Sequence, residues 1–248
     1  LVEDCVSPKP AIEVSGLTFA FDGAREPVFQ SLDLQVPAGS RTLLLGANGV
    51  GKSTLMRLCA GKHILPPEKL RVFGHSPYHD FQFSQRISFV DGHFPFHVDV
   101  EVGELLDRYR QGVDEQREAE LIEVLEIDRH WSLRTVSDGQ RRRVDLLLSL
   151  RQPADLLLLD EVTTQLDVVA RADFLHWLKR TNEKSGMTVV YTTHILDGLM
   201  RSGAEPWPTH LLLLRFAGPP RYLSVGEKPL FEFVEELLRA DIVHRKKG

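Results

Sequence analysis

The stretch GANGVGKST, residues 46–54, constrains the fold of this chain more than any other. It follows the apolar run RTLLLG (41–46), which predicts a short strand, and leads into KSTLMRLCAG (52–61), whose pattern predicts a helix. The stretch fits G-x-x-x-x-G-K-[ST], and a strand before it and a helix after it are the context that this motif requires. The sequence therefore predicts an α/β fold with a phosphate-binding loop. The alternative is a glycine-rich strand-to-helix turn in another kind of α/β protein.

Each residue type in this loop has a chemical use. Gly46, Gly49 and Gly51 let the backbone bend so that its N–H groups point at a β-phosphate, beside the positive end of the helix. Lys52 can bridge the β- and γ-phosphates, and the Ser53 hydroxyl can coordinate Mg²⁺. The predicted nucleotide-binding set from this loop is Gly46, Ala47, Asn48, Gly49, Val50, Gly51, Lys52, Ser53 and Thr54.

The run LLLLDE, residues 156–161, supplies carboxylates to the same chemistry. Four leucines predict a strand buried in the sheet, and Asp160 at its end could hold Mg²⁺ through water. Glu161 follows, where a carboxylate can orient or deprotonate an attacking water. Taken alone, such a run is usually just a strand that ends at solvent. The phosphate loop makes the catalytic interpretation the better one.

A second anion-binding turn lies in RTVSDGQRRRVD, residues 134–145. Ser137, Asp138 and Gly139 form a small-residue turn, and we expect a helix to open at Gln140 with its positive end toward an anion. This turn lies 85 residues beyond Lys52, so the chain carries two phosphate-binding elements. The following run, Arg141 to Arg143, is interpreted as solvated surface or as paired with the acidic helical lobe, without a catalytic role.

Composition excludes several classes of protein. The chain has 248 residues, 42% of them hydrophobic, enough for a full core, and a net charge of −5. That charge argues against a protein that coats nucleic acid. The only cysteines, Cys5 and Cys59, suggest no disulfide framework and favour a reducing compartment. No apolar run approaches the roughly 20 residues of a membrane span, so we expect none.

The pattern along the chain predicts one domain with an insertion. Residues 1–10 are predicted to be a disordered tail, and short alternating segments over 11–36 predict antiparallel strands. Residues 62–98 are predicted as loops with short strands, and a helical lobe is expected at about 98–151. Strand and helix then alternate up to residue 226, which predicts a mostly parallel sheet covered on both faces, and residues 227–248 predict a C-terminal helix and a basic tail.

The order of motifs resembles the nucleotide-binding domain of ABC proteins. GANGVGKST, VSDGQ (136–140), LLLLDE, TQLD (164–167) and TTH (192–194) follow one another in the family's order, within a match from about Val14 to Leu223. The resemblance implies a phosphate-loop, RecA-like fold with an antiparallel β subdomain and an inserted α-helical lobe, binding ATP and Mg²⁺. It makes VSDGQ the signature motif, places Asp167 at the end of the D-loop, and makes His194 the switch histidine. Phe21 stands where the family places an aromatic that stacks on adenine.

The predicted site follows from these motifs. Lys52, Glu161 and His194 are the expected catalytic residues, and Ser53 and Asp160 the expected Mg²⁺ ligands. Beyond the loop, the ATP-binding set adds Phe21, Ser137, Asp138, Gly139, Gln140 and Asp167. Because the signature turn lies far from its own chain's phosphate loop, the resemblance implies a head-to-tail homodimer. Each signature turn would then contact the γ-phosphate of an ATP bound to the second copy. Asp138 replaces a common glycine, and we expect its carboxylate to face away from the phosphates.

One family feature is absent. The glutamine that transporter domains carry before the helical lobe has no counterpart in ISFVDGHFPF (87–96), where Asp91 or Gly92 stands in its place. Either Mg²⁺ has one protein ligand fewer or Asp91 substitutes. The nearby His75, His79, His93 and His97 match no common zinc spacing and are interpreted as loop residues.

The residues in and around these motifs are most similar to those of the small ABC proteins of the plant ABCI subfamily and their fungal counterparts. That resemblance implies a cytosolic, regulatory ATPase. Together with the missing glutamine it favours a switch that acts on a protein partner. An organelle or the nucleus are the other locations considered, and no specific nucleic acid is expected as a ligand. The alternative is the ATPase subunit of a transporter whose membrane subunit is a separate chain. A third class, a nucleotide-binding scaffold without turnover, is disfavoured because Asp160, Glu161 and His194 are all present.

Overall fold

A computed structural model of the chain describes residues 10–91, 99–195, 199, 206–216 and 218–225. The predicted C-terminal helix and basic tail lie outside the described residues, as do Cys5, Gly92, His93 and His97. So does the predicted N-terminal tail except for Pro10, which is the first residue of a strand.

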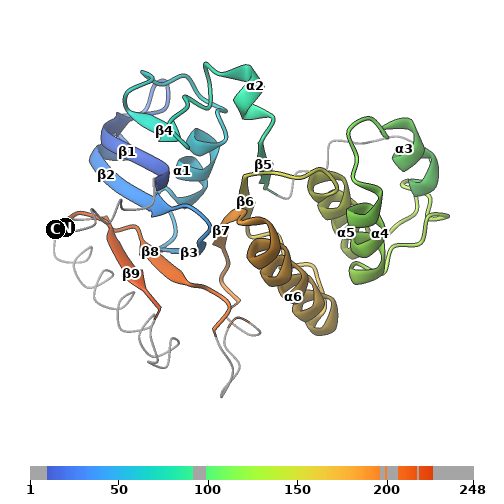
Figure 1. Cartoon of the computed structure of the whole chain (residues 1–248). Coiled ribbons are helices and arrows are strands. Elements are labelled where there is room, and N and C mark those ends of the chain that lie inside the picture. The colour runs from blue at the N-terminus through green and yellow to red at the C-terminus, as the bar shows by residue number, and fades with distance from the viewer. Residues whose placement is uncertain (1–9, 92–98, 196–198, 200–205, 217, 226–248) are drawn as a thin grey trace, which may run out of the picture.

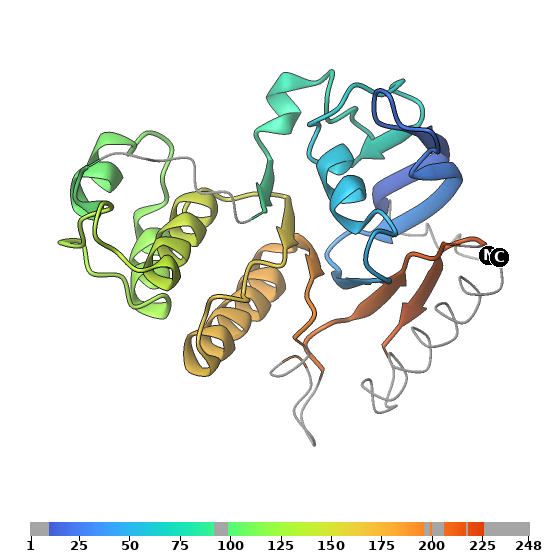
Figure 2. The same cartoon turned by 180° about the vertical axis from the view of Figure 1, so that it is seen from behind.

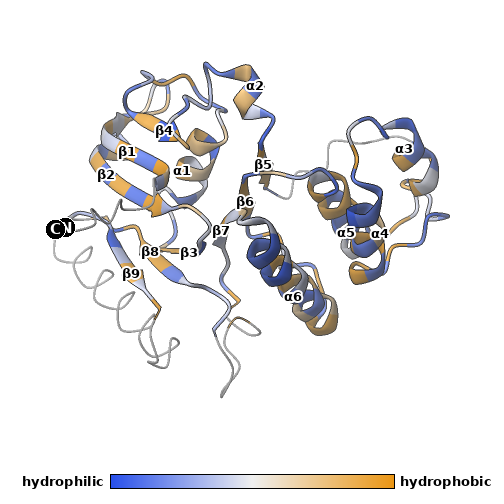
Figure 3. Ribbon diagram, in the orientation of Figure 1, coloured by the Kyte–Doolittle hydropathy of each residue, from blue (hydrophilic) through white to orange (hydrophobic). Residues whose placement is uncertain are grey.

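A three-stranded antiparallel sheet forms the first layer. Its order is β2-β1-β4, with β1 (Pro10–Phe19), β2 (Phe29–Pro37) and β4 (Leu70–Val72). Hydrophobic and hydrophilic residues alternate along β1 and β2 (Figure 3), because one face of this sheet is buried and the other meets solvent. The register pairs Val14 with Leu34. The predicted antiparallel strands over 11–36 are confirmed.

The main sheet has six strands in the order β5-β6-β7-β3-β8-β9. All neighbours are parallel except β9, which runs antiparallel to β8. The bounds are β3 (Arg41–Leu45), β5 (Ile87–Val90), β6 (Leu156–Asp160), β7 (Thr188–Thr192), β8 (His210–Leu213) and β9 (Arg221–Ser224). Every residue of β3, β6 and β7 is buried, which explains their nearly continuous apolar runs.

Successive residues of these strands point into two different cores. Leu157 and Leu159 pack with the helices that lie between β5 and β6 in the chain and with α6 (Val168–Ser185). Leu156 and Leu158 pack against α1 (Lys52–Cys59) and the antiparallel sheet. The predicted mostly parallel sheet, covered on both faces, is therefore confirmed.

Between β5 and β6 the chain forms a helical region with α3 (Val102–Arg108), α4 (Glu115–Val124) and α5 (Asp138–Leu150). Both views place these helices at the opposite end of the molecule from the antiparallel sheet (Figures 1 and 2). The region predicted as loops with short strands also contains a short helix, α2 (Phe81–Ser84), which we did not predict and which the Asp80 side chain caps. Within the residues that the structure describes, no helix is both long and apolar enough to span a bilayer.

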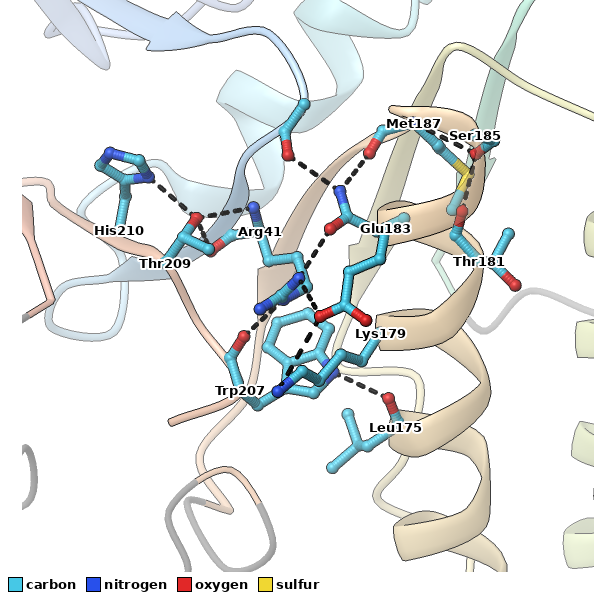
Figure 4. A network of polar contacts seen from close by, with 12 residues as sticks. Arg41, Leu175, Lys179, Thr181, Glu183, Ser185, Met187, Trp207, Thr209 and His210 are labelled. Atoms are coloured by element: carbon cyan, nitrogen blue, oxygen red, sulfur yellow. Dashed lines mark hydrogen bonds and ion pairs between the residues drawn. The ribbon is translucent and has the colours of Figure 1, made fainter. Parts of the chain in front are cut away.

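A buried arginine joins the amino-terminal end of β3 to α6 (Figure 4). The side chain of Arg41 is 4% exposed; its Nε donates to the Trp207 carbonyl at 2.7 Å and its Nη1 to Asn182 Oδ1 at 2.7 Å. Asn182 in turn donates to the carbonyl oxygens of Gly39 and Met187. The network fixes the end of the sheet opposite the phosphate loop.

We expect Arg41→Met to lower the free energy of unfolding by about 2–4 kcal/mol, because two buried acceptors lose a charged donor. Urea denaturation measures this change. Arg180→Met, on an exposed position of the same helix α6, is the matched control and should change stability by less than about 0.5 kcal/mol. Equal effects of the two substitutions would contradict the importance of the network.

Candidate functional site

The phosphate loop lies between the carboxyl end of β3 and the start of α1. Gly46 and Gly51 have φ angles of 149° and 104°, in a region that side-chain-bearing residues rarely adopt. A Cβ at Gly51 would lie 2.7 Å from the Phe29 ring, and one at Gly46 would lie 2.8 Å from the Leu214 carbonyl oxygen. Both positions therefore require glycine for space as well as for conformation.

The first turn of α1 suits an anion. It contains no acidic residue, and no side chain caps it, so its N–H groups and its positive dipole end are not neutralised by the chain itself. Asn48 and Gly49 are exposed, Ser53 is half-buried and Thr54 is buried. The loop thus has the open backbone donors that a phosphate needs.

Lys52 lies against the loop and near two carboxylates. Its Nζ donates to the carbonyl oxygens of Gly46 at 2.8 Å and Ala47 at 3.2 Å. Burial lowers the pKa of the Lys52 ammonium, and the negative charges of Glu161 and Asp160 oppose that shift. The structure therefore brings the predicted loop cation and the predicted strand-end carboxylates together.

Asp160 and Glu161 are held by a threonine that the sequence analysis did not single out. Thr192 Oγ1, at the end of β7, donates to Asp160 Oδ1 at 2.7 Å. The Glu161 N–H donates to the Thr192 carbonyl and to Thr192 Oγ1, both at 3.1 Å. The signal that could have found Thr192 is its place at the end of a buried strand, two residues before His194.

Glu161 has a backbone conformation that is rare for its residue type. Its φ is 53°, in the left-handed region, where the backbone of a glutamate is strained. Its Oε1 lies 2.8 Å from His194 Nε2, and the two side chains are 41% and 51% exposed. The predicted base and the predicted switch histidine are thus direct neighbours that solvent can reach.

Three strand ends place these groups at one edge of the sheet. Because β6, β7 and β3 are parallel neighbours, their carboxyl ends deliver Glu161, His194 and the phosphate loop side by side. Hydroxyl and carboxylate oxygens are the ligands that Mg²⁺ prefers, and Ser53 and Asp160 supply them. The backbone donors of the loop, Lys52 and this oxygen pair fit a magnesium nucleotide.

Phe21 lies in the turn after β1 and is 41% exposed. Its ring meets those of Phe19 and His63 edge-on, at centroid distances of 5.2 and 5.6 Å. The ring is therefore a surface group and not a core residue. An aromatic that stacks on a base must be accessible in this way.

The signature turn forms the start of α5. The Gln140 N–H donates to Ser137 Oγ at 3.2 Å, and the Ser137 N–H donates to Gln140 Oε1 at 2.9 Å, which makes a capping box. The helix begins at Asp138, two residues earlier than predicted, and Asp138 is exposed. A Cβ at Gly139 would lie 3.3 Å from the Gln165 carbonyl oxygen, so the turn packs on the segment before Asp167.

Asp167 caps α6. Its Oδ1 accepts from the N–H groups of Val169 and Ala170, both at 3.0 Å, and its Oδ2 lies 2.6 Å from Arg143 Nη2. The hydrogen bond from Ala170 is the main cause that lowers the pKa of this carboxyl; burial opposes it, and the charge of Arg143 lowers the pKa further. The predicted D-loop aspartate is thus bound to the signature helix of its own chain.

The expectation that Arg141 to Arg143 are solvated surface is wrong for Arg142 and Arg143. The side chain of Arg142 is 5% exposed and that of Arg143 is 15% exposed. Arg143 also lies 2.7 Å from Glu126 of the helical region, so the alternative of pairing with acidic residues holds for it. Arg142 instead faces the core, where it pairs with Asp145.

Asp91 comes directly after β5, where the family glutamine was expected. Val90 pairs with Leu159 in the sheet, so Asp91 stands beside the end of β6 that carries Asp160. Its Oδ2 lies 3.8 Å from Arg57 Nη2 of α1. Of the histidines nearby, His75 lies 2.8 Å from Asp80 and His79 lies 3.0 Å from the Leu65 carbonyl.

Comparison with known proteins identifies the family. The profile described as ABC transporter matches residues 29–164. The chain is 36% identical over 262 residues to ABC transporter I family member 20 of Arabidopsis thaliana, covering 95% of this chain and 78% of that protein. It is 37% identical over 219 residues to CCR4-associated factor 16 of Saccharomyces cerevisiae, covering 81% and 74%.

Solved structures agree at the level of the fold. The dimeric ATP-binding cassette MJ0796, in a post-hydrolysis state bound to ADP and Pi, superposes with a TM-score of 0.70 at 20% identity. The match covers 88% of this chain and 100% of the MJ0796 chain. The resemblance proposed from the motifs is confirmed: this chain belongs to the ABC transporter family, as an ATPase domain that uses ATP and Mg²⁺.

Proposed function

We propose that the chain is a cytoplasmic ATP-driven switch that dimerises head to tail around two ATP molecules and acts on a protein partner. The main observation in favour of ATP hydrolysis is the cluster at the carboxyl ends of β6 and β7. There Glu161 and His194 lie 2.8 Å apart beside the phosphate loop. A scaffold that only bound nucleotide would not need a carboxylate in this place.

In the proposed reaction, the loop N–H groups and Lys52 bind the β- and γ-phosphates of ATP. Ser53 and Asp160 would hold Mg²⁺, which neutralises charge on the phosphates when bound. Glu161 accepts a proton from water as the water oxygen bonds to the γ-phosphorus, and the bond to the ADP oxygen breaks to release ADP and phosphate. His194 holds the γ-phosphate and the water in place through its imidazole.

A second copy supplies the signature turn in this proposal. Ser137 and the Gly139 N–H contact the γ-phosphate of the partner's ATP, and Gln140 and Asp167 complete the seam. Phe21 stacks on adenine of its own chain's nucleotide. We expect the Asp138 carboxylate to face away from these phosphates, and the dimeric state named for MJ0796 is consistent with this assembly.

The choice of a switch over a transporter subunit rests on Asp91. In transporter domains the glutamine of this region faces the membrane subunit, whereas here an aspartate lies 3.8 Å from Arg57 of the same chain. The resemblance to the small ABC proteins without a fused membrane part supports the same choice.

A pull-down from native extract with ATP tests the partner. Tagged Glu161→Gln, which should bind ATP without hydrolysing it, is compared with Lys52→Ala, which should bind ATP weakly. A switch is expected to recover a non-membrane protein at least about 10-fold more with the first variant than with the second, because the partner recognises the closed dimer. Stoichiometric recovery of a multi-spanning membrane protein would establish the transporter subunit instead, and equal recovery by both variants would exclude an ATP-driven switch.

A further inference from the structure

A buried ion pair lies one turn inside α5, directly behind the signature turn. Arg142 Nη1 and Asp145 Oδ2 are 2.6 Å apart, and the two side chains are 5% and 8% exposed. Arginine is rarely buried unless its donors are satisfied, and this one has a further partner outside its own helix.

That partner belongs to the catalytic segment. Arg142 Nε donates to the carbonyl oxygen of Val162 at 3.0 Å. Val162 is fully buried and follows Glu161, so the bond holds the Val162–Thr163 peptide, one residue beyond the strained Glu161 backbone with its φ of 53°. A conformation of this kind persists only where the surroundings impose it.

The bonds to the Glu161 backbone itself come from β7 and from the loop that follows Glu161. The Glu161 N–H is bound to Thr192 of β7, and the Glu161 carbonyl accepts from the Thr164 hydroxyl at 3.2 Å. Arg142 differs from both because it comes from α5, the helix that begins with the signature turn. It is thus a direct link between the signature helix and the backbone of Val162, the residue after the predicted base.

We propose that Arg142 is a positioning residue for hydrolysis, which holds the Val162 carbonyl so that the Glu161 carboxylate points at the reacting water. This inference rests on the proposed function, in which Glu161 is the base. It also means that the helix that contacts the partner's ATP orients the base that acts on its own chain's ATP. The two sites of the dimer are then coupled within one chain.

The same helix provides a matched control. Arg151, at the carboxyl end of α5, forms an ion pair with Glu118 at 3.2 Å, and these side chains are 5% and 7% exposed. Its further donations go to the carbonyl oxygens of Leu106 and Tyr109, both outside the catalytic segment. The two pairs are alike in burial and chemistry and differ in whether they touch the loop after β6.

The test replaces each pair by apolar residues of similar size, which generally keeps or increases stability. For Arg142→Met with Asp145→Leu we expect kcat for ATP hydrolysis to fall by about 10- to 100-fold, since a small displacement of a catalytic group has this effect. The KM for ATP, and the ATP-driven dimerisation measured in a Glu161→Gln background, should stay within about twofold of the parent. Arg151→Met with Glu118→Leu should leave kcat within about threefold.

An unchanged kcat in the Arg142 pair would overturn the proposal, as would an equal fall of kcat in both pairs. If the Arg142 pair fails to fold, Arg142→Lys replaces it, because lysine keeps the charge beside Asp145 but lacks the planar fork that also reaches Val162. Lower kcat at unchanged KM is again the expected result, and wild-type kcat would overturn the proposal. Wild-type turnover in Glu161→Gln alone would refute the proposed base instead, so the two failures are distinguishable.

Discussion

Glu161→Gln is expected to lower kcat for ATP hydrolysis by about 100- to 10,000-fold, the contribution of a general base. Glutamine has the shape of glutamate but cannot accept the proton of the attacking water. The substitution keeps the loop, Lys52 and the oxygens of Ser53 and Asp160, so ATP should still bind and the dimer should accumulate. Phosphate release measures kcat, and size-exclusion chromatography with ATP measures the dimer.

Glu123→Gln is the control for this prediction, because Glu123 is an exposed glutamate of α4 far along the chain from the cluster. It should leave kcat unchanged. Lys52→Ala should abolish turnover for a different reason, since the β- and γ-phosphates lose their cation, and it should also weaken ATP-driven dimerisation. Wild-type turnover in Glu161→Gln would show that the base is another group.

Mixing two inactive variants should restore activity. Ser137→Arg blocks the signature turn and Lys52→Ala disables the phosphate loop, so each homodimer has two defective sites. In a head-to-tail heterodimer both defects fall in the same site, and the other site is intact. Random mixing at equal amounts should recover up to about a quarter of the wild-type rate, because half of the dimers are mixed and each has one intact site of two.

The control mixes Lys52→Ala with a chain that carries both substitutions, a combination in which no intact site can form. It should stay inactive. If mass spectrometry detects the heterodimer of the single variants and no activity returns, the signature turn does not act on the partner's ATP. Ser137→Ala, which removes only the hydroxyl, repeats the experiment should the arginine prevent association.

The parallel sheet and its helices could be predicted because their signals are local. LLLL before Asp160 is apolar on every residue, which is typical of a strand covered on both faces, and the loop glycines have geometric requirements visible in the motif. The fold class and the family followed from these segments.

Other features could not be predicted because they depend on distant partners. Thr192 is one threonine among several until β7 is placed beside β6, when its hydroxyl meets Asp160. The arginine run was misinterpreted because residues 141, 142 and 143 point about 100° apart around a helix. Only Arg142 shares the buried face with Asp145, and the one available signal was an aspartate inside the apolar stretch VDLLLSL.

The capping box at the start of α5 has a consequence for how tightly ATP can join two copies. The Ser137 hydroxyl accepts the N–H of Gln140, yet it keeps its own proton, which can still be donated to a phosphate oxygen. The Ser137 side chain is therefore already held in one rotamer in the folded monomer. Its side-chain entropy is lost when the chain folds and not when two copies associate. A preordered turn of this kind lets a single hydroxyl contribute nearly its full contact energy to the closure of the dimer.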